Sequence, residues 1–267
     1  MRNLRLESTM LDVEILDPLA VDRAASIFHR DGFVCIKDPL TDEQFDLLKA
    51  ASEHVMQEQE EAVGRANMNR GVARHSFGMQ THHWAWCMLI DLPTVLPILD
   101  VIWASDEYTC TGAGGDYSLP GARIQHLHSD LGKDFFQDPW GMCTVQDPPA
   151  PFIVVNFTMV DFTAENGAIR FVPGTHRSRA PIPALDIEPA WMKSNQLCAP
   201  ANTAIIRDVR CWHGGTANNS DHKRPMTSAG YFAPWRRPQE EKVLPRVHFD
   251  SLSPRGQRLC RYIVSDD

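Results

Sequence analysis

The segment IQHLHSDLG, residues 124–132, places His126, His128 and Asp130 within five residues of one another. Imidazole nitrogen and carboxylate oxygen are common ligands of divalent transition metals in proteins. The segment is predicted to be a β-strand, and residues i and i+2 of a strand project from the same face. His128 and Asp130 are therefore expected to offer two ligands to one metal site.

The spacing of a histidine and an aspartate two residues apart is a weak signal by itself. With eleven histidines and 22 aspartates, chance gives about one such pair, and the sequence contains three. The pair at 29 and 31 lies at the end of an expected helix, where a cation beside the last carbonyls is favourable. The pair at 248 and 250 lies in a polar, proline-flanked segment with no histidine after it. Context therefore favours the middle pair as a metal site.

A facial iron site needs a second histidine and leaves the opposite positions open. His213 is expected at the end of an apolar strand that begins at Ile205, just before Gly214-Gly215. Glycines there would let the backbone approach a bound metal or ligand closely. His222 competes for the role but lies in the polar turn NNSDHK, where we expect it to be solvated. Eleven residues after His213, Arg224 offers a two-pronged donor for a carboxylate, such as that of an α-keto acid.

The secondary structure expected to position these residues is mainly helical in the first part of the chain and mainly β after it. Residues 21–30 and the stretch after Thr41 have helical spacing, and GFVCIKD between them is predicted to be a strand. Residues 62–86 lack a clean period and are expected to form a loop or lid, and LPTVLPILDVIWAS is predicted to be a helix interrupted at Pro97. Short β-rich runs follow, separated by Gly, Pro and Asn. A mainly β barrel or sandwich with helices outside it is the predicted fold.

Composition narrows the class of protein. The 267 residues are 43% hydrophobic with a formal net charge of -8, which favours one domain over residues 1–267 and argues against nucleic acid as a partner. The seven cysteines form no C-x-x-C pair and are expected to be reduced thiols. The start, MRNLRLESTMLDVEILDP, lacks a signal-peptide pattern, and no apolar run reaches the roughly 20 residues that span a membrane. These features predict a cytoplasmic chain that acts on a small molecule, without membrane contact. They do not predict whether the chain forms oligomers.

Four blocks of sequence, in a fixed order, form a more specific pattern than any single motif does. They are FHRDGFVCIKDPLTDEQFDLL, HSD, MVDFTAENGAIRFVPGTHRS and DVRCWHGGTANNSDHKR. With these blocks the sequence resembles the phytanoyl-CoA dioxygenase family of iron(II)- and 2-oxoglutarate-dependent oxygenases. The resemblance covers most of residues 20–235. It implies a double-stranded β-helix, the jelly-roll barrel of the cupin type, with the metal near one mouth.

The resemblance also implies roles for individual residues. Matched to the family pattern, His128, Asp130 and His213 would bind Fe(II), and Arg224 would hold the distal carboxylate of 2-oxoglutarate. Gln125 and Thr216 are weaker candidates for polar contacts with this cosubstrate. Related halogenases carry Gly or Ala at the position of the carboxylate ligand, so Asp130 favours oxygen insertion or desaturation over chlorination.

The reaction that the resemblance implies consumes O2 and 2-oxoglutarate, releases succinate and CO2, and most often hydroxylates an unactivated C–H bond. The substrate would be a small metabolite or natural product. Residues 62–86 are expected to face the mouth of the site. Arg70 and Arg74 there suit a carboxylate on the substrate, and His83 and Trp84 suit packing against a ring or chain. The competing interpretation is that these arginines are solvated and the tryptophans belong to the core.

An alternative function stays open from the sequence. A cupin-like metal-dependent enzyme or binding protein that does not use 2-oxoglutarate would also have a jelly-roll barrel, because a fold does not fix a function. In that case Arg224 would have no cosubstrate to bind. Binding of 2-oxoglutarate therefore distinguishes the two hypotheses.

Overall fold

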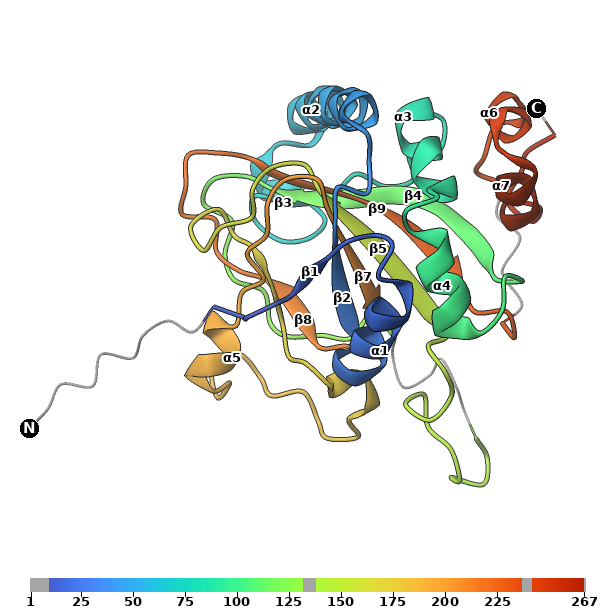
Figure 1. The fold of residues 1–267 in the computed structure, drawn as a ribbon. Coiled ribbons are helices and arrows are strands. Elements are labelled where there is room, and N and C mark those ends of the chain that lie inside the picture. Colours follow the sequence, from blue (N-terminus) through green and yellow to red (C-terminus); the bar gives the residue numbers. More distant parts are fainter. Residues whose placement is uncertain (1–9, 132–137, 237–241, 267) are drawn as a thin grey trace, which may run out of the picture.

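A computed structural model describes residues 10–131, 138–236 and 242–266 of the chain. Gly132, the last residue of the motif at 124–132, lies outside the described residues. So do the first nine residues, on which the expectation of no signal peptide partly rests. Figure 1 shows one large twisted sheet with helices packed on one side and a smaller pair of strands on the other. The expectation of a mainly β fold with flanking helices is confirmed.

The large sheet has seven strands, and the small one has two. In spatial order the large sheet contains β1 (Ile15–Leu16), β2 (Phe33–Lys37), β7 (Thr203–Asp208), β5 (Phe152–Thr158), β9 (Arg224–Phe232), β4 (Thr109–Ser118) and β3 (Arg74–Ser76). All of its neighbouring strands are antiparallel except β1 and β2. The small sheet pairs β6 (Ile169–Phe171) with β8 (His213–Gly215). Strands distant in sequence thus lie side by side, as a site assembled from separate segments requires.

Most helices precede or follow the β-rich part of the chain, whereas α5 lies between β6 and β7. They are α1 (Val21–Asp31), α2 (Asp42–Val63), α3 (Trp84–Cys87), α4 (Leu96–Trp103), α5 (Ala190–Ser194), α6 (Arg246–Ser251) and α7 (Pro254–Leu259). Short 3-10 turns cover Arg65–Asn67, Met88–Asp91 and Thr175–Arg177. In Figure 1, α2, α3 and α4 lie over the same side of the large sheet.

Local chemistry explains where the first two helices begin and end. Gly32 follows α1 with φ of 86°, a left-handed conformation that glycine adopts without strain. Thr41 begins α2 with a capping box, in which its hydroxyl accepts from the backbone N–H of Gln44 and the Gln44 side chain accepts from that of Thr41. The helices predicted over residues 21–30 and after Thr41 are confirmed. Pro97 does not interrupt its helix, because it occupies the first turn of α4, where no intrahelical N–H bond is lost.

Successive side chains of each strand point to opposite faces of the large sheet, one of which contacts the hydrophobic core while the other lines a cavity. On β5, Ile153, Val155 and Phe157 are buried in the main hydrophobic core together with residues of α1, α2 and α4. The alternate residues, Phe152, Val154 and Asn156, line a cavity on the opposite face. The core helices therefore leave the second face of the sheet available for a site.

Two segments differ from the sequence predictions. Residues 124–130 are extended but form no strand, because only His128 makes a bridge, to His213. Residues 62–86 are not a continuous irregular loop, since they include the end of α2, a 3-10 turn, β3 and the start of α3. β3 pairs with β4 at the edge of the large sheet, so part of the expected lid is built into the fold.

Across the described ranges, no single helix is long and apolar enough to cross a membrane. One bent pair of helical segments, 84–91 with 96–103, has the length and composition of a membrane span, and those two properties are the only ones that suggest it.

Candidate metal centre

His128, Asp130 and His213 converge, with one potential ligand atom from each lying within 4.8 Å of the others. The Nε2 of His128 is 3.7 Å from Oδ1 of Asp130, and the Nε2 of His213 is 3.5 Å from Oδ2. The backbones of His128 and His213 exchange two hydrogen bonds, at 2.9 and 3.0 Å. This antiparallel bridge brings together two residues that are 85 positions apart in the sequence.

His213 occupies a different place in its element from the one predicted. The strand that begins near Ile205 is β7, which ends at Asp208, and His213 begins the separate strand β8. The turn between them redirects the chain from the large sheet to the small one. His213 therefore lies beside His128, with which its backbone forms the antiparallel bridge.

Backbone carbonyls orient both imidazoles. The Nδ1 of His213 lies 2.9 Å from the carbonyl of Cys211, and the Nδ1 of His128 lies 3.2 Å from that of His126. A neutral histidine that donates from Nδ1 to a carbonyl leaves the Nε2 lone pair for a metal. Both Nε2 atoms face Asp130. The orientation of the two rings thus suits metal binding through Nε2.

The local electrostatics also favour the protonation states that metal binding needs. Burial, together with the nearby charge of Arg207, lowers the pKa of His213 to about 3. Burial also lowers the pKa of His128. For Asp130, burial acts to raise the pKa, but the charge of Arg207, the two histidines and the Arg207 hydrogen bond together hold it well below its usual range. At neutral pH the site presents two neutral imidazoles and one carboxylate.

Arg207 was not identified from the sequence and contacts the site directly. Its Nη1 donates to Oδ2 of Asp130 at 2.7 Å, and its Nε donates to Oδ1 of Asn156 at 2.9 Å. The side chain is 9% exposed and comes from β7, while Asn156 comes from the neighbouring β5. The signal in the sequence was a charged residue directly after the apolar stretch AII, residues 204–206. Arg207 fixes the orientation of the carboxylate within the site.

The three predicted ligands open into an inner cavity of about 430 Å³ that also contains Arg224. Arg224 is 1% exposed, its Nε donates to Oγ of Ser118 at 3.2 Å, and its Nη2 lies 3.6 Å from Oδ1 of Asp116. Its Nη1 is buried without a hydrogen-bond partner among the described residues. A buried donor left unpaired costs free energy, so this guanidinium is suited to receive an acceptor from a ligand.

Arg74 lies beside Arg224 and is held by residues near the WHGG motif. Its Nη2 donates to the carbonyl of Thr216 at 2.8 Å, and burial, followed by the charge of Arg224, lowers its pKa to about 10. A Cβ on Gly215 would lie 2.5 Å from Cζ of Arg74. Glycine at 215 thus makes room for an arginine side chain, and not only for a bound group as the sequence suggested.

The two weaker cosubstrate candidates make internal contacts. The carboxamide oxygen of Gln125 accepts from the backbone N–H of Gly215 at 2.9 Å, although Gln125 does line the inner cavity. The hydroxyl of Thr216 donates to the carbonyl of Ala168 at 2.7 Å and accepts from Gln196 at 2.8 Å. Both side chains join neighbouring segments of the site, and their contact with a cosubstrate stays a prediction.

The four predicted substrate residues fall in two different places. Arg70 and Arg74 line the inner cavity together with Arg224. His83 precedes α3, and Trp84 lies in α3 with its ring 6.0 Å from that of His248. In the part of the chain that is described, His83 and Trp84 do not line the inner cavity.

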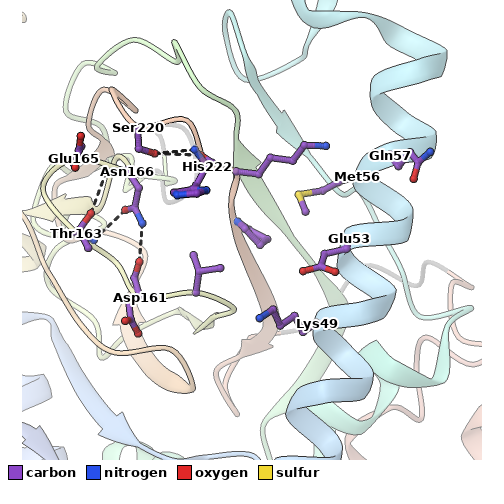
Figure 2. Close-up of a pocket in the computed structure, with 13 residues that line it drawn as sticks. Lys49, Glu53, Met56, Gln57, Asp161, Thr163, Glu165, Asn166, Ser220 and His222 are labelled. Atoms are coloured by element: carbon purple, nitrogen blue, oxygen red, sulfur yellow. Dashed lines mark hydrogen bonds between the residues drawn. The ribbon is translucent and has the colours of Figure 1, made fainter.

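A separate groove of about 780 Å³ lies between α2 and the loops around Asn166 and His222. Figure 2 shows Lys49, Glu53 and Met56 of α2 on one side and the hydrogen-bonded turn of Asp161 to Asn166 on the other. Its lining shares no residue with the inner cavity at the metal ligands, as far as the described residues extend. We therefore do not assign the chemistry to this groove.

Two named relatives resemble the chain in sequence. The dioxygenase andF of Emericella variicolor is 30% identical over 157 residues, which are 55% of this chain and 53% of andF. The iron/alpha-ketoglutarate-dependent dioxygenase okaE of Penicillium ochrochloron is 27% identical over 147 residues, which are 53% of this chain and 45% of okaE. These matches span about half the length of each relative.

A solved structure shows the same fold. The epimerase SnoN, in complex with Fe3+, alpha ketoglutarate and nogalamycin RO, superposes with a TM-score of 0.60 at 19% identity, over 81% of this chain and 84% of SnoN. The expected jelly-roll architecture is thereby confirmed. The family model for phytanoyl-CoA dioxygenase (PhyH) matches residues 28–226, which is most of the chain. The chain therefore belongs to the phytanoyl-CoA dioxygenase family, and it is a non-haem iron dioxygenase that depends on 2-oxoglutarate.

Proposed function

We propose that this dioxygenase hydroxylates an unactivated C–H bond of a small organic molecule, with Fe(II) bound by His128, Asp130 and His213. The balanced reaction inserts one oxygen atom of O2 into the C–H bond and the other into succinate, as 2-oxoglutarate loses CO2. The observation that carries the proposal is the combination of three convergent ligand atoms and the unpaired, buried Nη1 of Arg224 in one cavity. Iron, when bound, supplies the activation of O2.

The protein's own residues would bind and orient the cosubstrate. Arg224 is buried and pre-oriented by Ser118 and Asp116, so it offers Nη1 to the distal carboxylate without rearrangement. Arg74 adds a second guanidinium to the same cavity, which a dicarboxylate would find favourable. A cavity of about 430 Å³ is within the usual range for small-molecule sites and suits a five-carbon diacid.

This placement changes the expectation about the substrate. A carboxylate on the substrate was expected from Arg70 and Arg74, but both line the inner cavity with Arg224. We assign their charge to 2-oxoglutarate. A charged substrate therefore has no separate support from these two residues.

The presence of Asp130 supports oxygen insertion. A carboxylate at this position, fixed by Arg207, occupies the coordination position that a halide would need. The alternative of a metal enzyme that does not use 2-oxoglutarate would leave the buried Nη1 of Arg224 without a ligand acceptor. We therefore rank it below the oxygenase.

The test begins with apoprotein, Fe(II) and 2-oxoglutarate mixed without oxygen. We expect a weak visible charge-transfer band, and we expect succinate to form when air and a substrate from a metabolite panel are added. Replacing Arg224 with Gln should weaken 2-oxoglutarate binding by about a hundredfold, because the charge-assisted hydrogen bonding from the unpaired Nη1 is lost. The matched control is Arg123→Gln, since Arg123 is exposed and lies outside the cavity lining. No band, together with unchanged metal binding and activity in Arg224→Gln, would refute the proposal.

A further inference from the structure

A second, larger cavity of about 1,200 Å³ adjoins the metal centre. We call it the outer chamber, and it is lined by residues 126–131, 138–146, 178–185, 210 and 212, though not by each residue of these ranges. His128 lines both the outer chamber and the inner cavity, so the two spaces meet at a predicted metal ligand. A molecule in the outer chamber would thus lie beside the reacting centre, on the side away from Arg224.

The walls of the outer chamber are mainly apolar. Leu127 and Trp212 each directly precede a predicted ligand histidine, and they form one hydrophobic cluster with Val172, against which Ile182 packs. Val145 and Leu185, from the lining segments 138–146 and 178–185, add further apolar surface. The apolar surface therefore begins at the residues next to the ligands and continues outward.

The charged side chains that line the described walls already have partners. Asp138 accepts from the backbone N–H groups of Trp140, Met142 and Cys143. Arg179 pairs with Asp147 at the exposed rim. Arg210 is 2% exposed, pairs with Asp208 through Nε and Nη2, and uses Nη1 for the carbonyls of Val145 and Pro148.

A charge on a ligand in the outer chamber would therefore lose water without gaining an unpaired opposite charge, which is costly. The contrast with the inner cavity is direct, because Arg224 there keeps a buried donor unpaired. The two cavities thus differ in the kind of molecule that each one favours.

We propose that the outer chamber binds the oxidised substrate and that this substrate is a neutral, mainly apolar molecule, such as a fused ring system or a branched hydrocarbon skeleton. The inference rests on the proposed oxygenase function, because it takes His128 as a metal ligand. The volume of about 1,200 Å³ exceeds what a five-carbon diacid needs and is slightly above the usual range of about 300–1,000 Å³ for small-molecule sites, so it leaves room for a ring system. Polar groups on the substrate are expected at its exposed end, near the rim.

The experiment uses two probes that differ by one charge. N-phenyl-1-naphthylamine is neutral, and 8-anilino-1-naphthalenesulfonate has the same ring skeleton with an added sulfonate. Binding of each is measured by fluorescence to protein loaded with 2-oxoglutarate and Zn(II), so turnover plays no part. With Mn(II) in place of Zn(II), the proton lines of a probe beside the metal should broaden.

A matched pair of variants locates the binding. Leu185 lines the outer chamber, whereas Ile187, two residues further along, is 73% exposed and outside the lining. Leu185→Asp should weaken binding of the neutral probe by about tenfold or more, because it adds an unpaired carboxylate to an apolar wall. Ile187→Asp should leave that binding unchanged.

We expect the neutral probe to bind at least about tenfold more tightly than the anionic one, and its proton lines to broaden with Mn(II). Equal affinity of the two probes, an absence of broadening, or an equal effect of the two variants would overturn the proposal. The Fe(II)-2-oxoglutarate band, recorded on the same preparations, separates the two hypotheses. If the band forms and the neutral probe fails these tests, only the outer chamber assignment fails; if no band forms, the oxygenase function itself fails.

Discussion

The ion pair between Arg207 and Asp130 allows a quantitative test of how the site is held in place before metal binds. Arg207→Met removes the hydrogen bond to Asp130, and such bonds to charged groups contribute about 1.5–3 kcal/mol. One third of the Asp130 side chain is exposed, so solvent screening places the value at the lower end, about 1.5 kcal/mol. The substitution also leaves Oδ1 of Asn156, a residue 3% exposed, without its donor, at a further cost of about 1–3 kcal/mol. We expect a total loss of about 3 kcal/mol in the free energy of unfolding.

A double-mutant cycle with Asp130→Asn isolates the part that belongs to the ion pair. The cycle should give a coupling energy of about 1.5 kcal/mol, since the Asn156 contribution cancels between the two backgrounds. The pH dependence has a defined sign. Arg207 lowers the folded-state pKa of Asp130, so its contribution is complete above the unfolded value near pH 4 and is lost as the pH falls toward the folded-state pKa.

The measurement is urea unfolding of the four proteins in the presence of a metal chelator, at pH 8, pH 6 and below pH 4. Equal coupling at pH 8 and 6 and a smaller value in acid are expected. Arg123→Met, at an exposed position, serves as the control and should change stability by less than about 0.5 kcal/mol. A coupling energy below about 0.5 kcal/mol at pH 8 and pH 6 would refute the idea that Arg207 holds the carboxylate.

Three further predictions test other parts of the structure. Gly215→Ala should displace the Arg74 guanidinium and weaken 2-oxoglutarate binding by about tenfold in calorimetry, because the added Cβ would lie 2.5 Å from Cζ of Arg74; unchanged affinity would contradict this. Exposed Cys143 should react with a thiol reagent at pH 8 in the native protein, whereas Cys35, whose pKa burial raises to about 12, should react only after unfolding; mass spectrometry of the labelled peptides decides. Thr41→Ala should lower the free energy of unfolding by about 1 kcal/mol through loss of the capping box, and Thr41→Ser should restore most of it.

The three predicted ligands could be found from sequence because the chemistry of each ligand is carried by a residue type. His128 and Asp130 need only an extended backbone to share a face, and that condition holds although residues 124–130 form no strand. His213 was recognisable from its glycine neighbours and from the spacing to Arg224. The resemblance of the family blocks then implied a jelly-roll barrel, which is a fold that brings distant segments together.

Arg207 and the outer chamber could not be predicted in the same way. Arg207 bonds to a residue 77 positions earlier, and only the pairing of β7 with β5 reveals which side chains share its face. The outer chamber combines segments around 127 and 212, which belong to the ligand motifs, with segments around 145 and 182, which have no distinctive residue pattern. Arg70 and Arg74 were predicted to contact the substrate, and they line the inner cavity. Their position relative to Arg224, which decides what they bind, depends on the pairing of β3 with β4 and of β4 with β9.

The distribution of charge explains how one active site can take two chemically different molecules. The inner cavity is lined by four arginines, at positions 70, 74, 207 and 224, and by two aspartates, at 116 and 130. Before any metal binds, this lining has two positive charges in excess, which complement a dicarboxylate dianion such as 2-oxoglutarate. In the described lining of the outer chamber, Arg179 and Arg210 are each paired with an aspartate, and Asp138 accepts from three backbone N–H groups, so no unpaired positive charge remains there. Cosubstrate and substrate are therefore separated by charge into two cavities that meet at His128, where the metal would bind.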